Sequence, residues 1–204
     1  DWNSSITVDS ATKSLSPVSI MGSTDKFGSP VYTNGIVTTV QEISDSGELE
    51  KCVAIYEYQI RAVGATASSP VKVGLLGGDG AGSNPTGTFI VRSNANSASQ
   101  QAAYAIRVGF KIDNNWIIYE PHVDQTTGGT KAENRYNGPT STVKQNSNGN
   151  FEGGSNVSKD IFTLSDTNAH AIKMYVWIEG TDDQCVNELQ TDELKGQIQF
   201  TVIK

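Results

Sequence analysis

The chain has few histidines and no long apolar run, and each shortage argues against a class of protein. His122 and His170 are the only histidines among the 204 residues, and no H-E-x-x-H motif is present. A zinc site needs three or four converging ligands, so none is expected. No G-x-S-x-G motif occurs, and no stretch approaches the roughly 20 apolar residues of a membrane helix. The sequence therefore predicts no catalytic site, no cofactor and no membrane span.

Charged residues are also scarce, at 18% of the chain, and their balance is acidic, with a net charge of −7. Nucleic-acid binding depends on an excess of basic residues, so it is not expected. The polar surface must come from Ser, Thr, Asn, Gln and Gly, a composition typical of secreted β proteins and poor in strong helix formers. The first residues, DWNSSITVDS, lack the basic start and apolar core of a signal peptide. We therefore expect either a cytosolic protein or a mature exported chain.

Cysteine is limited to Cys52 and Cys185, each in or beside a strand pattern. Two isolated cysteines in such a protein predict one disulfide and an oxidising compartment; the alternative is two unrelated buried thiols. The bond would close a loop of more than 130 residues, worth about 4–5 kcal/mol in the chain-entropy model. The pair favours a secreted, mature chain.

Segments in which apolar and polar residues alternate, as in β-strands, are by contrast frequent. Residues 103–120 predict a hairpin, and the dipeptide Asn34-Gly35 predicts a turn within 31–43. Residues 51–62 form a long strand pattern whose first half is apolar on both faces, which predicts a central place in a sheet. Further short strands are expected at 71–76, 88–91, 161–164 and 196–204, and a helical turn only within 186–195.

These patterns predict an all-β fold: an antiparallel β-sandwich, jelly-roll-like, with long loops and little helix. We expect one sandwich domain over residues 31–204, interrupted by polar loops at 77–86 and 121–159. The first loop is rich in glycine but has no phosphate-binding motif. The second has few apolar residues and is expected to hold a short hairpin.

Residues 1–30 are rich in Ser and Thr and read as an extended arm. This arm is either an ordinary first strand or a detachable segment that pairs with another molecule. Its apolar side chains, the candidates for insertion into a neighbour, are Ile6, Val8, Val18 and Ile20.

The stretch from Ala169 to Cys185 begins as a strand with Ile172, Met174, Val176 and Ile178 on one face. Lys173, Tyr175, Trp177 and Glu179 share the other face, Gly180 ends the strand, and Thr181, Asp182 and Asp183 form a polar turn. A calcium site at these acidic residues is an alternative, but their spacing does not fit the EF-hand pattern. The pattern favours a structural corner over a catalytic centre.

The aromatic residues offer a different interpretation. Exposed rings can stack on sugars, so a carbohydrate-binding face is an alternative to half-buried core positions. The candidate rings are Trp2, Trp116, Tyr119, Tyr175 and Trp177.

The C-terminal run MYVWIEGTDDQC, followed by GQIQFTVI, resembles the end of TasA/camelysin-like secreted proteins of Gram-positive biofilm matrices. The resemblance is most specific at Trp177, Glu179, Gly180, Asp182 and Cys185, which it implies form a structural corner. It also implies a jelly-roll-like sandwich that is exported by a specialised signal peptidase. In such fibres the N-terminal segment of one subunit completes the sheet of the next.

We therefore expect a non-enzymatic, secreted structural subunit that forms an extracellular homopolymer by donor-strand exchange through its N-terminal arm. The alternative is a cell-surface module that binds carbohydrate or a host surface, with polysaccharide as the candidate partner. A secreted hydrolase is a third and weaker alternative.

Overall fold

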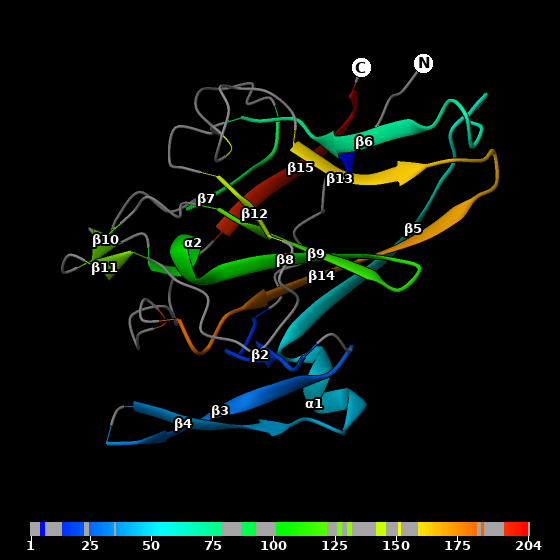
Figure 1. Cartoon of the computed structure of the whole chain (residues 1–204). Helices are drawn as coiled ribbons and strands as arrows, with labels where there is room; N and C mark the ends of the chain where they lie inside the picture. Colours follow the sequence, from blue (N-terminus) through cyan, green and yellow to red (C-terminus); the bar gives the residue numbers. More distant parts are fainter. Residues whose placement is uncertain are drawn as a thin grey trace.

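The computed structural model describes residues 5–6, 14–22, 25–34, 36–78, 87–92, 101–121, 126–127, 130–131, 142–145, 151, 159–182, 185 and 194–203. Strands hold most of these residues, and they form two main sheets packed face to face with a smaller sheet below (Figure 1). The predicted all-β fold of packed antiparallel sheets is therefore confirmed. The jelly-roll strand order stays a prediction.

The first main sheet is built around the longest strand, β15 (Leu194–Ile203). Its strand order is β1 (Ser5–Ile6), β15, β6 (Val71–Leu75) and β13 (Lys159–Leu164), all antiparallel. A further strand, β7 (Phe89–Arg92), also pairs with β15, along residues 194–197.

The second main sheet has the order β12 (Thr142–Lys144), β9 (Asn115–Glu120), β8 (Ile106–Ile112), β14 (His170–Ile178) and β5 (Val53–Ile60). Only the β12–β9 pair is parallel within this sheet. The predicted hairpin is confirmed as β8–β9, which turns at Asp113 with φ of 51°. The central position predicted for the first half of residues 51–62 is wrong, because β5 lies at the sheet edge. On its outer face another layer covers Val53, whereas Ile55 is 43% exposed.

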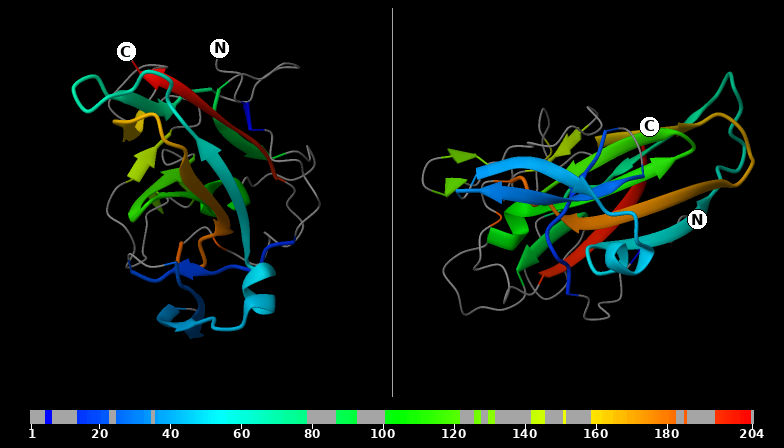
Figure 2. Two further views of the ribbon diagram at one scale, coloured as in Figure 1. Left: turned by 90° about the vertical axis from the view of Figure 1, so that its right-hand side faces the viewer. Right: turned by 90° about the horizontal axis from the view of Figure 1, so that it is seen from below.

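That third layer consists of β2 (Ser19–Ile20), β3 (Phe27–Thr33) and β4 (Ile36–Glu42), and Figure 2 shows it stacked under the second sheet beside α1 (Ser46–Glu50). The predicted turn at Asn34 joins β3 to β4, with a positive φ of 54° at this residue. The turn is possible because asparagine tolerates the left-handed region better than most residues.

Two short helices were not predicted. The carboxylate of Asp45 caps α1 by accepting the backbone N–H of Glu48 at 2.9 Å, a capping signal that the sequence does contain. The second helix, α2 (Gln101–Ala105), leads directly into β8. Neither described helix has the length and apolar character needed to cross a membrane. The helical turn expected within 186–195 lies mostly outside the described residues, and β15 already begins at Leu194.

The polar excursion 121–159 contains the short β10 (Thr126–Thr127) and β11 (Thr130–Lys131) ribbon, so the hairpin expected there is confirmed. Val143 and Phe151 from the same excursion are buried, 3% exposed each, in the main core.

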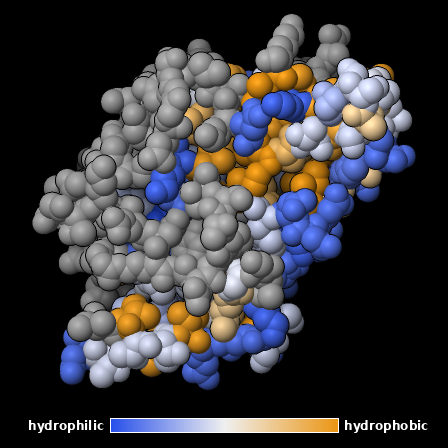
Figure 3. Space-filling model, viewed as in Figure 1, coloured by the Kyte–Doolittle hydropathy of each residue, from blue (hydrophilic) through white to orange (hydrophobic). Residues whose placement is uncertain are grey.

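Apolar side chains form two clusters on opposite faces of the second sheet. The main cluster fills the space between the two large sheets, where apolar atoms form a band in the upper right of Figure 3. The outer cluster lies between the second sheet and the third layer. Its members are Val18, Ile20, Phe27, Cys52, Val53, Trp116, Ile118, Tyr175 and Trp177. The second sheet is therefore buried on both faces around Tyr175 and Trp177, whereas its outer face is exposed at Ile55 and Glu57.

The predicted disulfide is wrong, because Cys52 and Cys185 are both free thiols. Cys52 belongs to the outer cluster, whereas Cys185 packs against the main cluster, so the two thiols have different neighbours. Burial, with Asp182 and Glu179 nearby, raises the pKa of the Cys185 thiol to about 12. This thiol therefore stays protonated and unreactive at neutral pH.

Candidate assembly site

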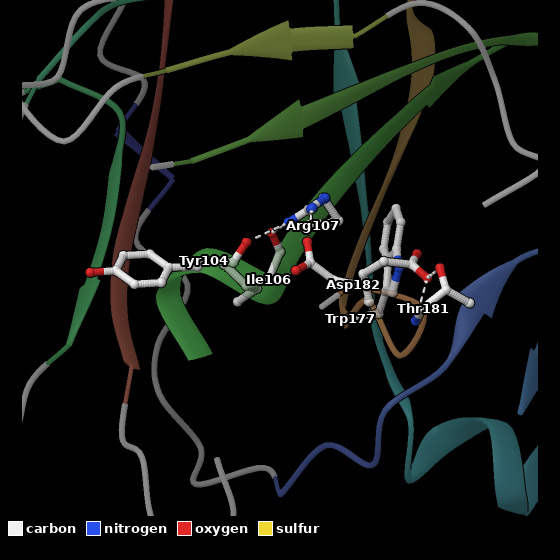
Figure 4. A network of polar contacts seen from close by, with 7 residues as sticks. Tyr104, Ile106, Arg107, Trp177, Thr181 and Asp182 are labelled. Atoms are coloured by element: carbon white, nitrogen blue, oxygen red, sulfur yellow. Dashed lines mark hydrogen bonds and ion pairs between the residues drawn. The ribbon is translucent and has the colours of Figure 1, made fainter. Parts of the chain in front are cut away.

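The end of β14 turns sharply around the carboxylate of Glu179. Trp177 Nε1–H donates to Glu179 Oε2 at 3.0 Å, and the backbone N–H and hydroxyl of Thr181 donate to Glu179 Oε1 at 3.1 and 2.6 Å. Figure 4 shows these side chains converging beside the strand end. Glu179 is fully buried, and burial raises its pKa, opposed by the bonds from Thr181 and Trp177. The carboxylate thus closes the turn as a hydrogen-bond acceptor.

A buried ion pair joins this turn to the start of β8. Arg107 Nη2 lies 2.5 Å from Asp182 Oδ2, with the two side chains 1% and 0% exposed. Arg107 Nη1 also donates to the carbonyls of Tyr104 and Ile106 at 2.7 and 2.8 Å. A buried pair has a large desolvation cost, so its clearest contribution is to fix one geometry of the corner.

Gly180 lets three segments meet at the corner. Its N–H donates to Val18 O, and Val18 N–H donates to Ile178 O, both at 2.9 Å. The hydroxyl of Tyr32 donates to Gly180 O at 2.6 Å. A Cβ at Gly180 would lie 2.5 Å from Pro30 Cγ, so only glycine fits without a shift of β3. The corner therefore holds both the segment around Val18 and the β3 strand.

The structure brings together Trp177, Glu179, Gly180 and Asp182, four of the residues expected to form a structural corner. The fifth, Cys185, donates its backbone N–H to Asp182 O at 2.9 Å. The oxygens of Glu179 and Asp182 are engaged by donors of the protein, and Asp183 lies outside the described residues. No three His, Cys, Asp or Glu side chains among the described residues are placed to hold a metal ion. Arg107 was not recognised as part of the corner, because it alternates with apolar residues and so resembles a solvent-facing position.

The arm side chains fall into two groups. Val18 and Ile20 are 0% and 1% exposed and pack in the outer cluster of their own chain, where Ile20 pairs with Phe27 of β3. Ile6 instead pairs with Ile198 of β15. Val8 lies outside the described residues. Two of the four candidate insertion residues are thus built into the body of the same molecule.

The outer edge of β15 is a separate feature that bears on assembly. On its inner side β15 pairs with β7 at Leu194–Gln197 and with β6 at Phe200–Ile203, and Leu76 N–H donates to Gln199 O between them. On its outer side the described residues contribute only β1, through Ser5–Gln199 and Ile6–Ile198. The edge of a sheet can accept another strand through its backbone N–H and C=O groups.

The described aromatic candidates do not form the stacking platform that was an alternative to core positions. Trp116, Tyr119, Tyr175 and Trp177 are 6%, 0%, 3% and 0% exposed. Trp116 stacks on Tyr175 with ring centroids 4.7 Å apart, and Phe27 meets Trp177 edge-on at 5.4 Å. Trp2 lies outside the described residues. These rings serve the two cores, not a binding face.

Comparison with protein-family models, curated proteins and solved structures finds no match for this chain.

Proposed function

We propose that this protein is a secreted, non-enzymatic structural subunit that polymerises into an extracellular filament by donating its N-terminal segment to a neighbour. One observation carries the proposal: in the part of the arm that the structure describes, β1 contacts the edge of β15 through two residue pairs. Two pairs form and separate at low cost, since isolated two-stranded contacts of this length are barely stable. A neighbouring copy's segment can replace them on a strand ten residues long.

The exchangeable part of the arm ends before residue 14. Ser16 N–H donates to Lys51 O at 2.9 Å, and the next residues bind the corner through Val18. These contacts hold residues 14–21 to the body of the molecule. We therefore assign exchange to residues 1–13, with Ile6 and Val8 as inserting side chains and Val18 and Ile20 as the attachment.

The proposed contact is head-to-tail, so each copy gives one arm and receives another. Such a heterologous contact propagates without closing and produces a filament. Thirteen extended residues span about 45 Å, roughly the diameter expected for a compact domain of this size. The arm is thus long enough to reach an adjacent copy.

Export and the extracellular setting are supported by the Ser/Thr/Asn/Gly-rich composition and by the C-terminal resemblance. The cysteines no longer support them, because both thiols are free. The alternative of a carbohydrate-binding or host-binding module finds no exposed aromatic platform among the described candidates.

Removal of residues 1–13 tests the proposal. The full chain is expected to form filaments visible by negative-stain electron microscopy, and the shortened chain to remain a monomer with the circular dichroism of the full chain. The control is a full-length chain in which residues 1–13 are scrambled, which should also fail to assemble. Filaments from the shortened chain, or a full chain that stays monomeric at every concentration, would refute the proposal.

A further inference from the structure

The side chains of β15 divide between a face directed to the main core and a face directed outward. Ile198 and Phe200 are 3% and 6% exposed and point into the main core. Val202 follows on the same face but is 36% exposed, an apolar side chain left partly uncovered near the strand end. Lys195, on the opposite face, is exposed. A strand added here would therefore need apolar residues on one face and polar residues on the other.

The described pairs fix how an added strand would lie. Ser5 faces Gln199 and Ile6 faces Ile198 in an antiparallel arrangement. If this pairing is continued by sequence, each step forward along the arm is one step back along β15. Val8 then faces Gly196, Asp9 faces Lys195, and Trp2 faces Val202.

In this register the sequence of the arm has the alternation that the edge requires. An arm bound in this register would direct Trp2, Ser4, Ile6 and Val8 to the core and Asp1, Asn3, Ser5, Thr7 and Asp9 outward. Every apolar residue among the first nine falls on the inner face. A slip of one residue would turn all of them outward, so the register is strongly specified.

Three positions along the edge are complementary to the arm. Trp2 would cover the exposed Val202, and Asp9 would face the opposite charge of Lys195 across the strands. The third position is Gly196, which pairs with Ile90 of β7. The side chain of Ile90 fills the space of the missing side chain, since a Cβ at Gly196 would be only 3.0 Å from Ile90 Cγ1. Val8 would add its apolar side chain beside Ile90.

We infer that residues 1–9 of a second copy of this chain bind the outer edge of β15 in the register set by Ile6 and Ile198, with Asp9 against Lys195 and Trp2 against Val202. This inference rests on the proposed function and names the acceptor and the register within it. The occupant is the arm of a neighbour, so binding depends on protein concentration.

The test uses full-length chains and measures the critical concentration for filament formation by sedimentation. D9K and K195D are each expected to raise it about two- to fivefold, as like charges then face each other across the strands. The double variant D9K/K195D should return to within about twofold of the parent chain. W2S should raise it further than either charge reversal. The matched control is N3K, because residue 3 faces Thr201 in this register. The double variant N3K/K195D should therefore have a critical concentration no lower than that of N3K.

Each other outcome has a distinct meaning. If filaments depend on residues 1–13 but D9K/K195D shows no rescue, the register is wrong and the proposed function stands. If the charge reversals change the melting temperature of a dilute monomer but never assembly, the occupant is the chain's own arm and the inference fails. If the parent chain forms no filaments at all, the proposed function fails with it.

Discussion

Glu179 is a carboxylate that the fold uses as a hydrogen-bond acceptor in a buried place, and its neighbours explain why it is tolerated there. Three donors from Trp177 and Thr181 reach its two oxygens. Without these donors, burial of the carboxylate would cost several kcal/mol. The corner therefore depends on a small set of polar side chains within a largely apolar surrounding.

The pH dependence of stability should reveal this burial. Burial raises the pKa of Glu179 above its ordinary value of 4.5. The folded chain then binds this proton more tightly than the unfolded chain. The stabilisation from this tighter binding is full below pH 4.5 and is lost as pH rises through the pKa of Glu179 in the folded chain. In urea unfolding from pH 4 upward, the parent chain should lose stability relative to Glu179→Gln.

Glu57→Gln is the control, because this carboxylate is exposed and pairs with Lys173 at the surface. It should not reproduce the trend. A stability difference between the parent and Glu179→Gln that stays constant, or grows with pH, would contradict the burial of Glu179.

The Arg107–Asp182 pair predicts a large loss when one partner is removed. Arg107→Met leaves the Asp182 carboxylate buried without its cation and should destabilise the chain by about 3–5 kcal/mol in urea unfolding. Arg107→Met combined with Asp182→Leu should recover much of this loss, since no unpaired charge remains. Lys173→Met, at an exposed pair, should cost about 1 kcal/mol or less. An Arg107→Met chain as stable as the parent would show that the pair has little influence.

At the scale of elements, the third layer buries the outer face of the second sheet around Tyr175 and Trp177. Phe27 of β3 is 0% exposed and lies against Trp177 and Tyr175, with ring centroids 5.4 and 5.9 Å away. The layer is small, and most of β3 and β4 beyond Gly28 is exposed or half-buried. Its attachment therefore depends on a few side chains near Phe27 and Val18.

Phe27→Ala should separate this layer from the second sheet. We expect a loss of about 3–5 kcal/mol, typical of a buried Phe truncated to Ala. Tryptophan fluorescence should shift to longer wavelength as water reaches Trp116 and Trp177. Ile55→Ala, at a residue 43% exposed, is the control and should leave both readouts nearly unchanged. An unshifted spectrum would mean that other contacts hold the layer in place.

The sequence predicted local turns and strands but not the packing of the third layer on the second sheet. The β8–β9 hairpin follows from local alternation and the turn at Asp113, and the turn between β3 and β4 follows from Asn34, so this hairpin and this turn were predicted correctly. The burial of the face that holds Trp177 was not predicted, because the residues that cover it, such as Phe27, lie far away in the sequence. Alternation separates two faces of a strand but does not say what covers each face.

The corner was predicted as a structural turn but without its partners. Gly180 and the acidic turn are local signals, whereas the contributions of Arg107, Val18 and Pro30 depend on long-range packing. The disulfide failed for the same reason, since two cysteines in strands say nothing about whether their strands meet.

For the whole molecule, the free thiols predict that stability does not depend on redox conditions. A disulfide across this long loop would contribute about 4–5 kcal/mol and raise the melting temperature by several degrees. We expect the melting temperature to be the same with and without a reductant, and thiol titration of the denatured, unreduced chain to find both cysteines reactive. A reductant-induced fall in the melting temperature would mean that Cys52 and Cys185 are joined.

The dependence of the first sheet on β15 has a consequence for biosynthesis. The strands β1, β6 and β7 all precede residue 93, yet each of them pairs with residues 194–203. These strands leave the ribosome long before their common partner, and such distant pairing slows folding. A nonsense mutation shortly before codon 194 would therefore release a polypeptide in which β1 and β7 lack their partner strand, β6 keeps only β13, and the main core is uncovered. Such a species is prone to aggregate.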